Sequence, residues 1–144
     1  MKSVSVVFCV ALGLFSCSTA KHSLKNKAPK FLDENTFLIT EISSDPLYGL
    51  TSEKPIEVGG KENGPTNERR FLNALTGTNG EAISYYRSGS CCMTKSENAI
   101  FGEYVLLDKY RLTWQGSNDT ISVYINMYDS GELMAPMGFG YKKK

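Results

Sequence analysis

Histidine is almost absent from this chain, whose 144 residues include only one, His22. Zinc and iron sites built on imidazole, and nucleophilic sites that use a histidine base, need histidine within the folded part of a protein. His22 lies in a polar, lysine-rich segment that we expect to be a linker. The composition therefore argues against hydrolases of the Ser-His-Asp or Cys-His type and against His-ligated metalloenzymes.

The chain also lacks a hydrophobic run long enough to cross a membrane. Its main apolar stretch, Val4–Phe15, follows Lys2 and is shorter than the about 20 residues that span a bilayer core. A short apolar stretch behind a positive charge is typical of a signal peptide. We therefore expect residues 1–16 to be a signal peptide rather than a transmembrane anchor.

The end of this stretch, Leu14-Phe15-Ser16-Cys17, resembles the lipobox of a bacterial lipoprotein. The resemblance implies that Cys17 carries fatty acyl chains such as palmitate and becomes the new N-terminus, and two or more such chains hold a protein firmly on a membrane. Ser18 stands where an aspartate would retain a lipoprotein in the inner membrane. We therefore expect a lipid anchor in the outer membrane, facing the periplasm; ordinary signal-peptidase cleavage near Ala20 is the alternative.

Cysteine is scarce, with four residues in the chain. Cys9 would leave with the signal peptide and Cys17 would be consumed by lipid, so only Cys91 and Cys92 would remain. One adjacent pair does not make a disulfide framework.

The body of the chain has fewer basic than acidic residues, whereas its ends carry basic residues only. Between Phe31 and Tyr141 there are eight basic and fifteen acidic residues, a net charge of −7, whereas the whole chain carries +1. Affinity for nucleic acids comes largely from clustered lysine and arginine, so we expect no nucleic-acid partner. Residues 17–30 and the C-terminal Lys142–Lys144 are lysine-rich. Each lysine could gain on the order of 1 kcal/mol near an anionic lipid surface, or could simply keep a flexible tether soluble.

The remaining pattern predicts one helix and several strands. Pro65 suits the first turn of a helix, apolar residues follow at helical spacing, and Gly77 would end it. Tyr104–Trp114 and Ile121–Tyr128 alternate apolar and polar residues, as half-buried strands do. Composition predicts four further segments: strands at Phe37–Ile42 and Glu81–Arg87, an edge strand at Leu133–Phe139 where Pro136 would limit pairing, and a long loop at Ser88–Gly102.

These elements predict the α+β class. One helix and about five strands in a single domain, residues 31–144, favour a small, mostly antiparallel β-sheet packed against one main helix.

Several runs in this domain resemble a family of small bacterial lipoproteins of the Bacteroidetes type. They are GPTNERRFLNALTGTNGEAISYYRSGSCC, LLDKYRLTW and ISVYINMYDSGELMAPMGF. The resemblance covers about Tyr48 to Tyr141 and brings no established activity with it. Its members often carry the automatic name 2-dehydro-3-deoxyphosphooctonate aldolase, but a (β/α)₈ barrel takes about 250 residues and alternating strand–helix units, and this chain has neither.

Cys91 and Cys92 admit three interpretations. They could pack as ordinary side chains, form a vicinal disulfide in an oxidising periplasm, or supply half of a soft-metal site with Met93 as a further sulfur. Adjacent Cα atoms are about 3.8 Å apart, below the usual disulfide span of about 4.4–6.8 Å, so a bond between them would be reducible.

Aromatic residues are the other candidate for function. Tyr124 and Tyr128 share one strand face, and Trp114 is expected on the neighbouring strand. With Arg87 beside them they could form a face that binds a glycan, a peptide or another protein. Packing around a small sheet explains the same residues without a ligand.

The sequence thus favours a lipid-anchored cell-envelope protein that binds a partner without catalysis. We expect no catalytic residue, no metal and no cofactor, and partners limited to the membrane and an envelope protein or glycan. The alternative is a small redox or soft-metal-handling protein that works through Cys91 and Cys92.

Overall fold

A computed structural model describes residues 28–60 and 63–144. The predicted signal peptide, Cys17, His22 and most of the predicted tether lie outside these residues. Among the described residues, no helix has the length and apolarity to cross a membrane.

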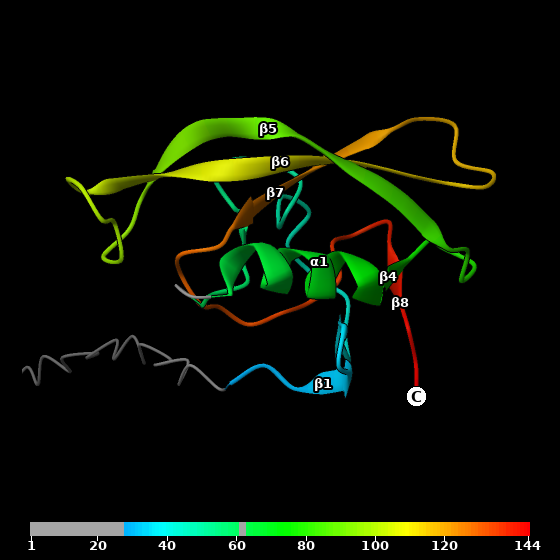
Figure 1. The fold of residues 1–144 in the computed structure, drawn as a ribbon. Coiled ribbons are helices and arrows are strands. Elements are labelled where there is room, and N and C mark those ends of the chain that lie inside the picture. Colours follow the sequence, from blue (N-terminus) through cyan, green and yellow to red (C-terminus); the bar gives the residue numbers. More distant parts are fainter. Residues whose placement is uncertain (1–27, 61–62) are drawn as a thin grey trace, which may run out of the picture.

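In the described part of the chain, a four-stranded sheet lies over one helix (Figure 1). The sheet has the order β3-β7-β6-β5, in which β3 (Ile56–Glu57) pairs with β7 (Ile121–Asn126) in parallel. β7 and β5 (Ile83–Lys95) flank β6 (Tyr104–Trp114) in antiparallel fashion. The helix, α1 (Gly64–Ala74), covers one face.

Two small sheets complete the described fold, one below the helix and one beside its C-terminal end (Figure 1). One pairs β1 (Phe31–Asp33) with β2 (Thr36–Phe37), and the other pairs β4 (Leu75–Thr76) with β8 (Gly140–Tyr141). The domain therefore has the predicted α+β class, with a mostly antiparallel main sheet and one helix.

Apolar residues from the helix and the sheet meet in one core. Alternation places Tyr110 and Leu112 of β6, and Val123 and Ile125 of β7, on the face that looks at α1. Other buried members come from the helix, the small sheets and the loops: Phe37, Ile39, Ile56, Val58, Phe71, Leu72, Ala74, Leu75, Ala135 and Phe139.

The helix begins where the sequence predicts, with Pro65 in its first turn, but it ends before the predicted stop at Gly77. The chain leaves helical geometry at Leu75, whose ψ is 153°. Leu75 pairs with Tyr141 in β4–β8 instead of continuing the helix. Strand pairing, which the local sequence does not reveal, outweighs helix propensity here.

The long loop expected at Ser88–Gly102 is wrong over its first half. β5 continues to Lys95, with register irregularities between Arg87 and Gly89 and between Cys91 and Met93. Each β-bulge adds a residue and breaks the alternation by which a strand is recognised.

Two other predicted strands are shorter than expected or absent. Only Phe37 of the predicted strand Phe37–Ile42 lies in a strand, β2, and Ile42 makes an isolated bridge with Ala135. Leu133–Phe139 is a loop, and the chain pairs again only in β8.

Candidate functional site

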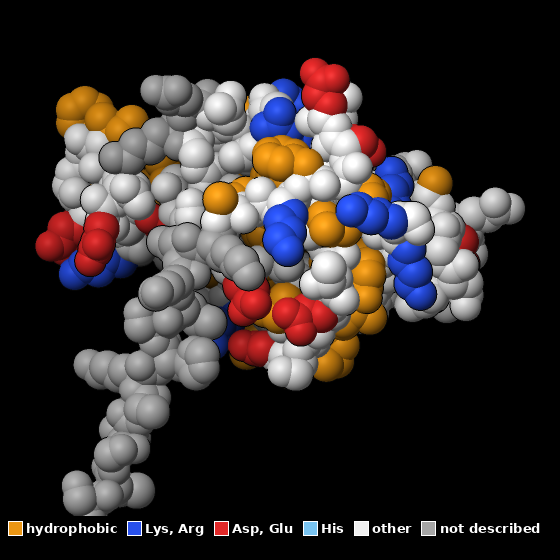
Figure 2. Space-filling model, turned by 90° about the horizontal axis from the view of Figure 1, so that it is seen from below, with side chains coloured by type: hydrophobic (Ala, Val, Ile, Leu, Met, Phe, Trp, Pro, Cys, Tyr) orange, Lys and Arg blue, Asp and Glu red, His pale blue; other side chains and the backbone are white. Residues whose placement is uncertain are grey.

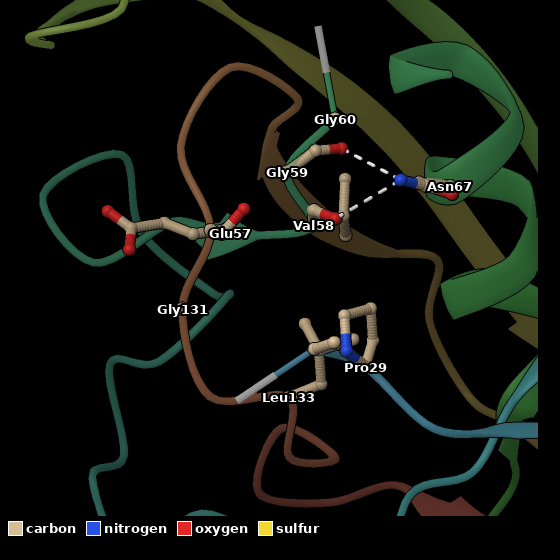
Figure 3. Close-up of a pocket in the computed structure, with 10 residues that line it drawn as sticks. Pro29, Glu57, Val58, Gly59, Gly60, Asn67, Gly131 and Leu133 are labelled. Carbon is tan, nitrogen blue, oxygen red and sulfur yellow. Dashed lines mark hydrogen bonds between the residues drawn. The ribbon is translucent and has the colours of Figure 1, made fainter. Parts of the chain in front are cut away.

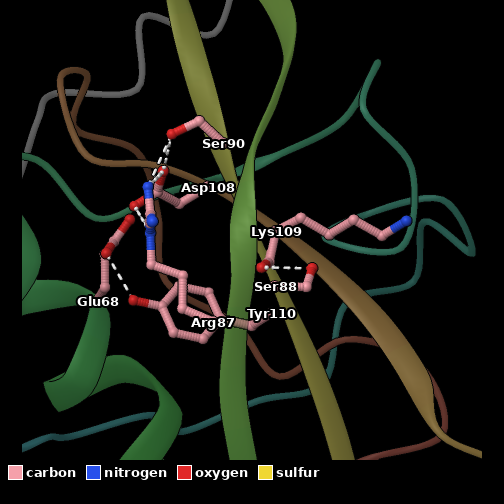
Figure 4. A network of polar contacts seen from close by, with 7 residues as sticks. All are labelled: Glu68, Arg87, Ser88, Ser90, Asp108, Lys109 and Tyr110. Carbon is pink, nitrogen blue, oxygen red and sulfur yellow. Dashed lines mark hydrogen bonds and ion pairs between the residues drawn. The ribbon is translucent and has the colours of Figure 1, made fainter.

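A polar network joins the helix to the sheet (Figure 4). Arg87 donates from Nε and Nη2 to the two carboxylate oxygens of Asp108, at 2.7 Å each. Ser90 Oγ lies 3.0 Å from Asp108 Oδ1. On the helix side, Tyr110 donates its hydroxyl to Glu68 Oε2 at 2.8 Å.

Burial gives this network unusual electrostatics. Glu68 is 1 % exposed, and its Oε1 has no hydrogen-bond partner. Burial raises the pKa of Glu68 to about 7, against the opposing effect of the Tyr110 hydroxyl. Burial and the neighbouring Glu68 raise the pKa of Tyr110 as well. The Arg87 side chain is committed to Asp108, whose side chain is only 6 % exposed, so this ion pair joins β5 to β6, and the Tyr110–Glu68 hydrogen bond joins β6 to α1.

The four residues predicted to form one binding face are not brought together. Residues paired directly across antiparallel strands share a face. Arg87 pairs with Tyr110, which pairs with Val123 of the core, whereas Tyr124 pairs with Lys109 on the opposite face.

Each of the predicted aromatic residues has its own neighbours. Trp114 lies on the helix side, with its ring centroid 5.3 Å from that of Phe139. The Lys109 ammonium lies 5.5 Å from the Tyr124 ring centroid. Tyr128 follows β7, and its backbone N–H donates to the side-chain oxygen of Asn126 at 2.9 Å.

Cys91 and Cys92 lie at the second irregularity of β5, and both are free thiols. Cys91 is half-buried opposite Leu107, and Cys92 is exposed in a left-handed conformation with φ of 47°. Burial, with Cys92 next to it, raises the pKa of Cys91 to about 11. Because the thiolate is the nucleophile and the metal ligand, this environment weakens Cys91 for either role at neutral pH.

The part of the chain that the structure describes contains no cluster of three or more histidine, cysteine, aspartate or glutamate residues placed to hold a metal ion.

A hollow of about 340 Å³ lies beside β3 (Figure 3). The Asn67 amide reaches into it from α1 but already donates to the carbonyls of Gly59, at 2.9 Å, and Val58, at 3.4 Å. The Glu57 carboxylate points away from Asn67 (Figure 3), and burial followed by the charge of Asp129 raises the pKa of Glu57. The hollow lies where the first described residues, β3 and the loop at Leu133 meet.

An open groove of about 760 Å³ lies beside the C-terminal β8. It combines apolar, hydroxyl and lysine side chains without a buried charged group. Its walls are Leu32, Ile42, Thr76, Thr78, Asn79, Gly80, Gly140, Tyr141, Lys142 and Lys143.

Large apolar side chains gather, exposed, at the outer end of the β5–β6 hairpin. We call this group the hairpin tip: Met93, Ile100, Phe101, Tyr104 and Leu106, which are between 50 % and 89 % exposed. In Figure 2, hydrophobic side chains gather at the end of the molecule where this hairpin ends, at the left. Contiguous exposed apolar surface on a folded domain marks an interaction site.

Asp129, which follows β7, holds the loop that carries the hairpin tip through side-chain hydrogen bonds. Asp129 Oδ1 accepts hydrogen bonds from Ser96 Oγ at 2.7 Å and from Asn98 Nδ2 at 2.8 Å, and Asp129 Oδ2 accepts one from Asn126 Nδ2 at 2.7 Å. Although burial raises the pKa of Asp129, these three bonds outweigh it and leave the pKa below its usual value.

The hairpin tip is missed when residues 88–102 are interpreted as one loop. A signal is nevertheless present, since Ile100 and Phe101 are the only large apolar residues between Lys95 and Glu103.

No family model, no curated protein and no solved structure matches this chain.

Proposed function

We propose that this protein is a lipid-anchored binding protein of the cell envelope and that the projecting β5–β6 hairpin is its binding element. The single observation that carries the binding role is the hairpin tip, where Phe101 is 89 % and Ile100 is 77 % exposed, more than any other large hydrophobic residue that the structure describes. Exposing such side chains to water is unfavourable unless a partner covers them.

The anchoring part of the proposal rests on the lipobox resemblance at Leu14–Cys17 and on the lysine-rich segment that follows it. Placement in the outer membrane, facing the periplasm, and membership of the small-lipoprotein family belong to the same proposal.

Expression of the full chain in a bacterial host, followed by membrane fractionation and intact mass measurement, tests the anchor. The wild-type protein is expected in the membrane fraction, without residues 1–16 and with the added mass of a diacylglycerol and a third acyl chain. Cys17→Ala should abolish the added mass. An unmodified wild-type protein beginning near Ala20 would disprove the anchor.

The alternative, a redox or soft-metal role, depends on Cys91 and Cys92. The raised pKa of Cys91 opposes it, because few molecules carry the reactive thiolate at neutral pH. It would regain support if the purified protein held one metal ion per chain that Cys91→Ser removed.

A further inference from the structure

The hairpin tip has the shape and composition of a membrane-contacting loop. Phe101 and Ile100 are adjacent at its apex, and Tyr104, 55 % exposed, stands behind them at the start of β6. Tyrosine is enriched where a protein crosses from the apolar layer to the headgroups, because its ring is apolar and its hydroxyl polar. We propose that the hairpin tip docks into the interfacial layer of a phospholipid bilayer, as a second and reversible contact beside the lipid anchor.

The outer end of the hairpin extends beyond the part of β6 that pairs with β7. β7 pairs with β6 only from Asp108 to Leu112, so the outer ends of β5 and β6 have no third strand beside them among the described residues. Met93 pairs with Leu106 across this two-stranded end, which places apolar side chains behind the apex. An apolar apex with no third strand beside it suits insertion between lipid headgroups.

Three backbone N–H groups at the start of the loop are already hydrogen-bonded within it. The backbone N–H of Ser96 donates to the Glu103 carbonyl at 2.9 Å. The N–H of Asn98 donates to Ser96 Oγ at 3.0 Å, and that of Ala99 to the Ser96 carbonyl at 3.4 Å. Unpaired backbone groups are costly away from water, so a loop with these bonds already made enters the headgroup region more readily.

The chain outside the described residues points to lipid as the partner, and here the inference rests on the proposed function. An acylated Cys17 would be joined to the domain by about a dozen residues, whose root-mean-square reach is about 20 Å. A bilayer would then always be within reach of the domain. Tethering raises the effective concentration of the second contact, so a weak insertion of two side chains suffices.

The charges around the hairpin tip select the kind of lipid. Lys95 and Glu103 form an exposed ion pair at 3.4 Å, and Glu97 adds a further exposed negative charge. Such a loop gains nothing from an anionic surface. The inference therefore specifies zwitterionic phospholipid, with docking driven by apolar burial.

Fluorescence quenching by brominated lipids tests the inference on the full chain, exported and processed by a bacterial host and reconstituted into phosphatidylcholine–phosphatidylethanolamine vesicles. Phe101→Trp places a fluorophore at the apex. Asn118→Trp is the matched control, since Asn118 is exposed in the loop at the opposite end of β6. Wild-type Trp114 supplies the baseline. Vesicle flotation, measured on the same samples, reports the anchor separately.

We expect both variants to float with the vesicles. The added fluorescence of Phe101→Trp should be quenched at least about twofold more than that of Asn118→Trp, because interfacial side chains lie about 5–10 Å into the headgroup–acyl boundary. Replacing part of the lipid with phosphatidylglycerol should not increase the quenching of Phe101→Trp.

The two readouts separate the docking inference from the proposed anchor. Flotation with equal quenching of the two variants overturns the docking inference and leaves the anchor intact, and then a protein partner becomes the favoured occupant. Quenching of Phe101→Trp without stable flotation supports docking and overturns the anchor. Failure of both readouts overturns both.

Discussion

Glu68 is the residue whose surroundings depart furthest from those of a surface carboxyl. Its side chain comes from α1 and meets Tyr110, with Asp108 and Arg87 of the sheet close behind (Figure 4). Its Oε1 is buried without a partner, and a buried unpaired charged oxygen is costly. A protonated Glu68 relieves that cost, in agreement with its raised pKa.

Replacing Glu68 tests this account through the pH dependence of stability. The pKa of Glu68 is about 7 in the folded protein against a reference value of 4.5, so the folded state holds the proton more tightly. The stability that this supplies is fully present below pH 4.5 and is lost as pH rises through 7. Glu68→Gln should remove that loss and be more stable than wild type at pH 8 by up to about 3 kcal/mol, at about 1.36 kcal/mol per pKa unit.

Urea unfolding at pH 4 and pH 8 measures the effect of Glu68→Gln. Glu41→Gln, at an exposed position, is the matched control and should retain the wild-type pH dependence. If Glu68→Gln keeps the same fall in stability between the two pH values, the buried carboxyl is not the group responsible.

Cys92 is strained by its backbone conformation rather than by its side chain. Its φ of 47° is in the left-handed region, which costs a residue with a Cβ about 1–2 kcal/mol. Cys92→Gly should therefore stabilise the protein by about 0.5–1 kcal/mol, after the entropy that glycine loses on folding. Thermal unfolding measures it. Cys91→Gly, which removes a half-buried side chain opposite Leu107, should destabilise instead, and the opposite order would contradict the assigned bulge.

At the level of elements, the glycine pair after β3 shows how closely two loops approach. Gly59 has φ of 64°, and a Cβ there would lie 2.9 Å from Ser130 Cβ. Gly102, in the hairpin loop, has a similar φ of 69° with open space around it. A side chain at either position would have to adopt the unfavourable left-handed backbone conformation. Only at Gly59 would it also collide with a neighbouring residue, Ser130.

Alanine at these two positions separates the two effects. Gly102→Ala should cost about 1–2 kcal/mol, the contribution of left-handed geometry alone. Gly59→Ala should cost about 1–3 kcal/mol more, because it also drives a methyl group into Ser130. Urea unfolding of both variants measures the difference, and equal losses would show that the loops can move apart freely.

Asp129 links the loop after β7 to the outer end of the β5–β6 hairpin. Asp129→Ala removes the acceptor of three hydrogen bonds, and hydrogen bonds to charged groups contribute about 1.5–3 kcal/mol each. We expect amide hydrogen exchange at residues 96–103 to become at least about tenfold faster, since about 1.4 kcal/mol corresponds to a factor of ten. Exchange within Tyr110–Trp114 should not change, and unchanged exchange at 96–103 would show that the strands alone hold the loop.

For the whole molecule, we expect apolar residues of the hairpin tip to contribute little to the free energy of unfolding, and apolar residues of the core to contribute much. Ile100→Ser combined with Phe101→Ser should leave the free energy of unfolding within about 0.5 kcal/mol of wild type, because neither side chain is buried. Leu72→Ala, at a fully buried position, should cost about 2–5 kcal/mol. Denaturant unfolding compares the two, and a large loss in the tip variant would mean that these side chains serve the fold.

Much of the fold could be predicted because its signals are local. The helix after Pro65 and the strands β6 and β7 each repeat with the period of their own geometry, and these elements alone indicate the α+β class. The hydrophobic stretch before Cys17 and the segregation of charge are also legible in the sequence, and they carry the proposed anchor.

The register of β6 and β7 decided which face of the sheet carries Tyr124, which the sequence did not determine. A single pairing, Lys109 with Tyr124 rather than Tyr110 with Tyr124, sends Tyr124 to the face away from Arg87, because side chains alternate between faces at every residue. The two irregularities in β5 interrupt its alternation of apolar and polar residues, so the second half of that strand could not be recognised from the sequence.

The sequence by itself determined where apolar and charged residues lie, because these properties belong to the residues themselves. It also determined where one helix and two long strands form, because their periodic patterns depend on near neighbours along the chain. Only the tertiary structure decided that Glu68 would meet Tyr110, 42 residues away, that β3 would pair in parallel with β7, and that Ile100 and Phe101 would be left uncovered at the end of a hairpin. Those outcomes depend on how the strands pair and how the helix packs on them. Contacts between residues far apart in the sequence decide this, and no local sequence pattern predicts them.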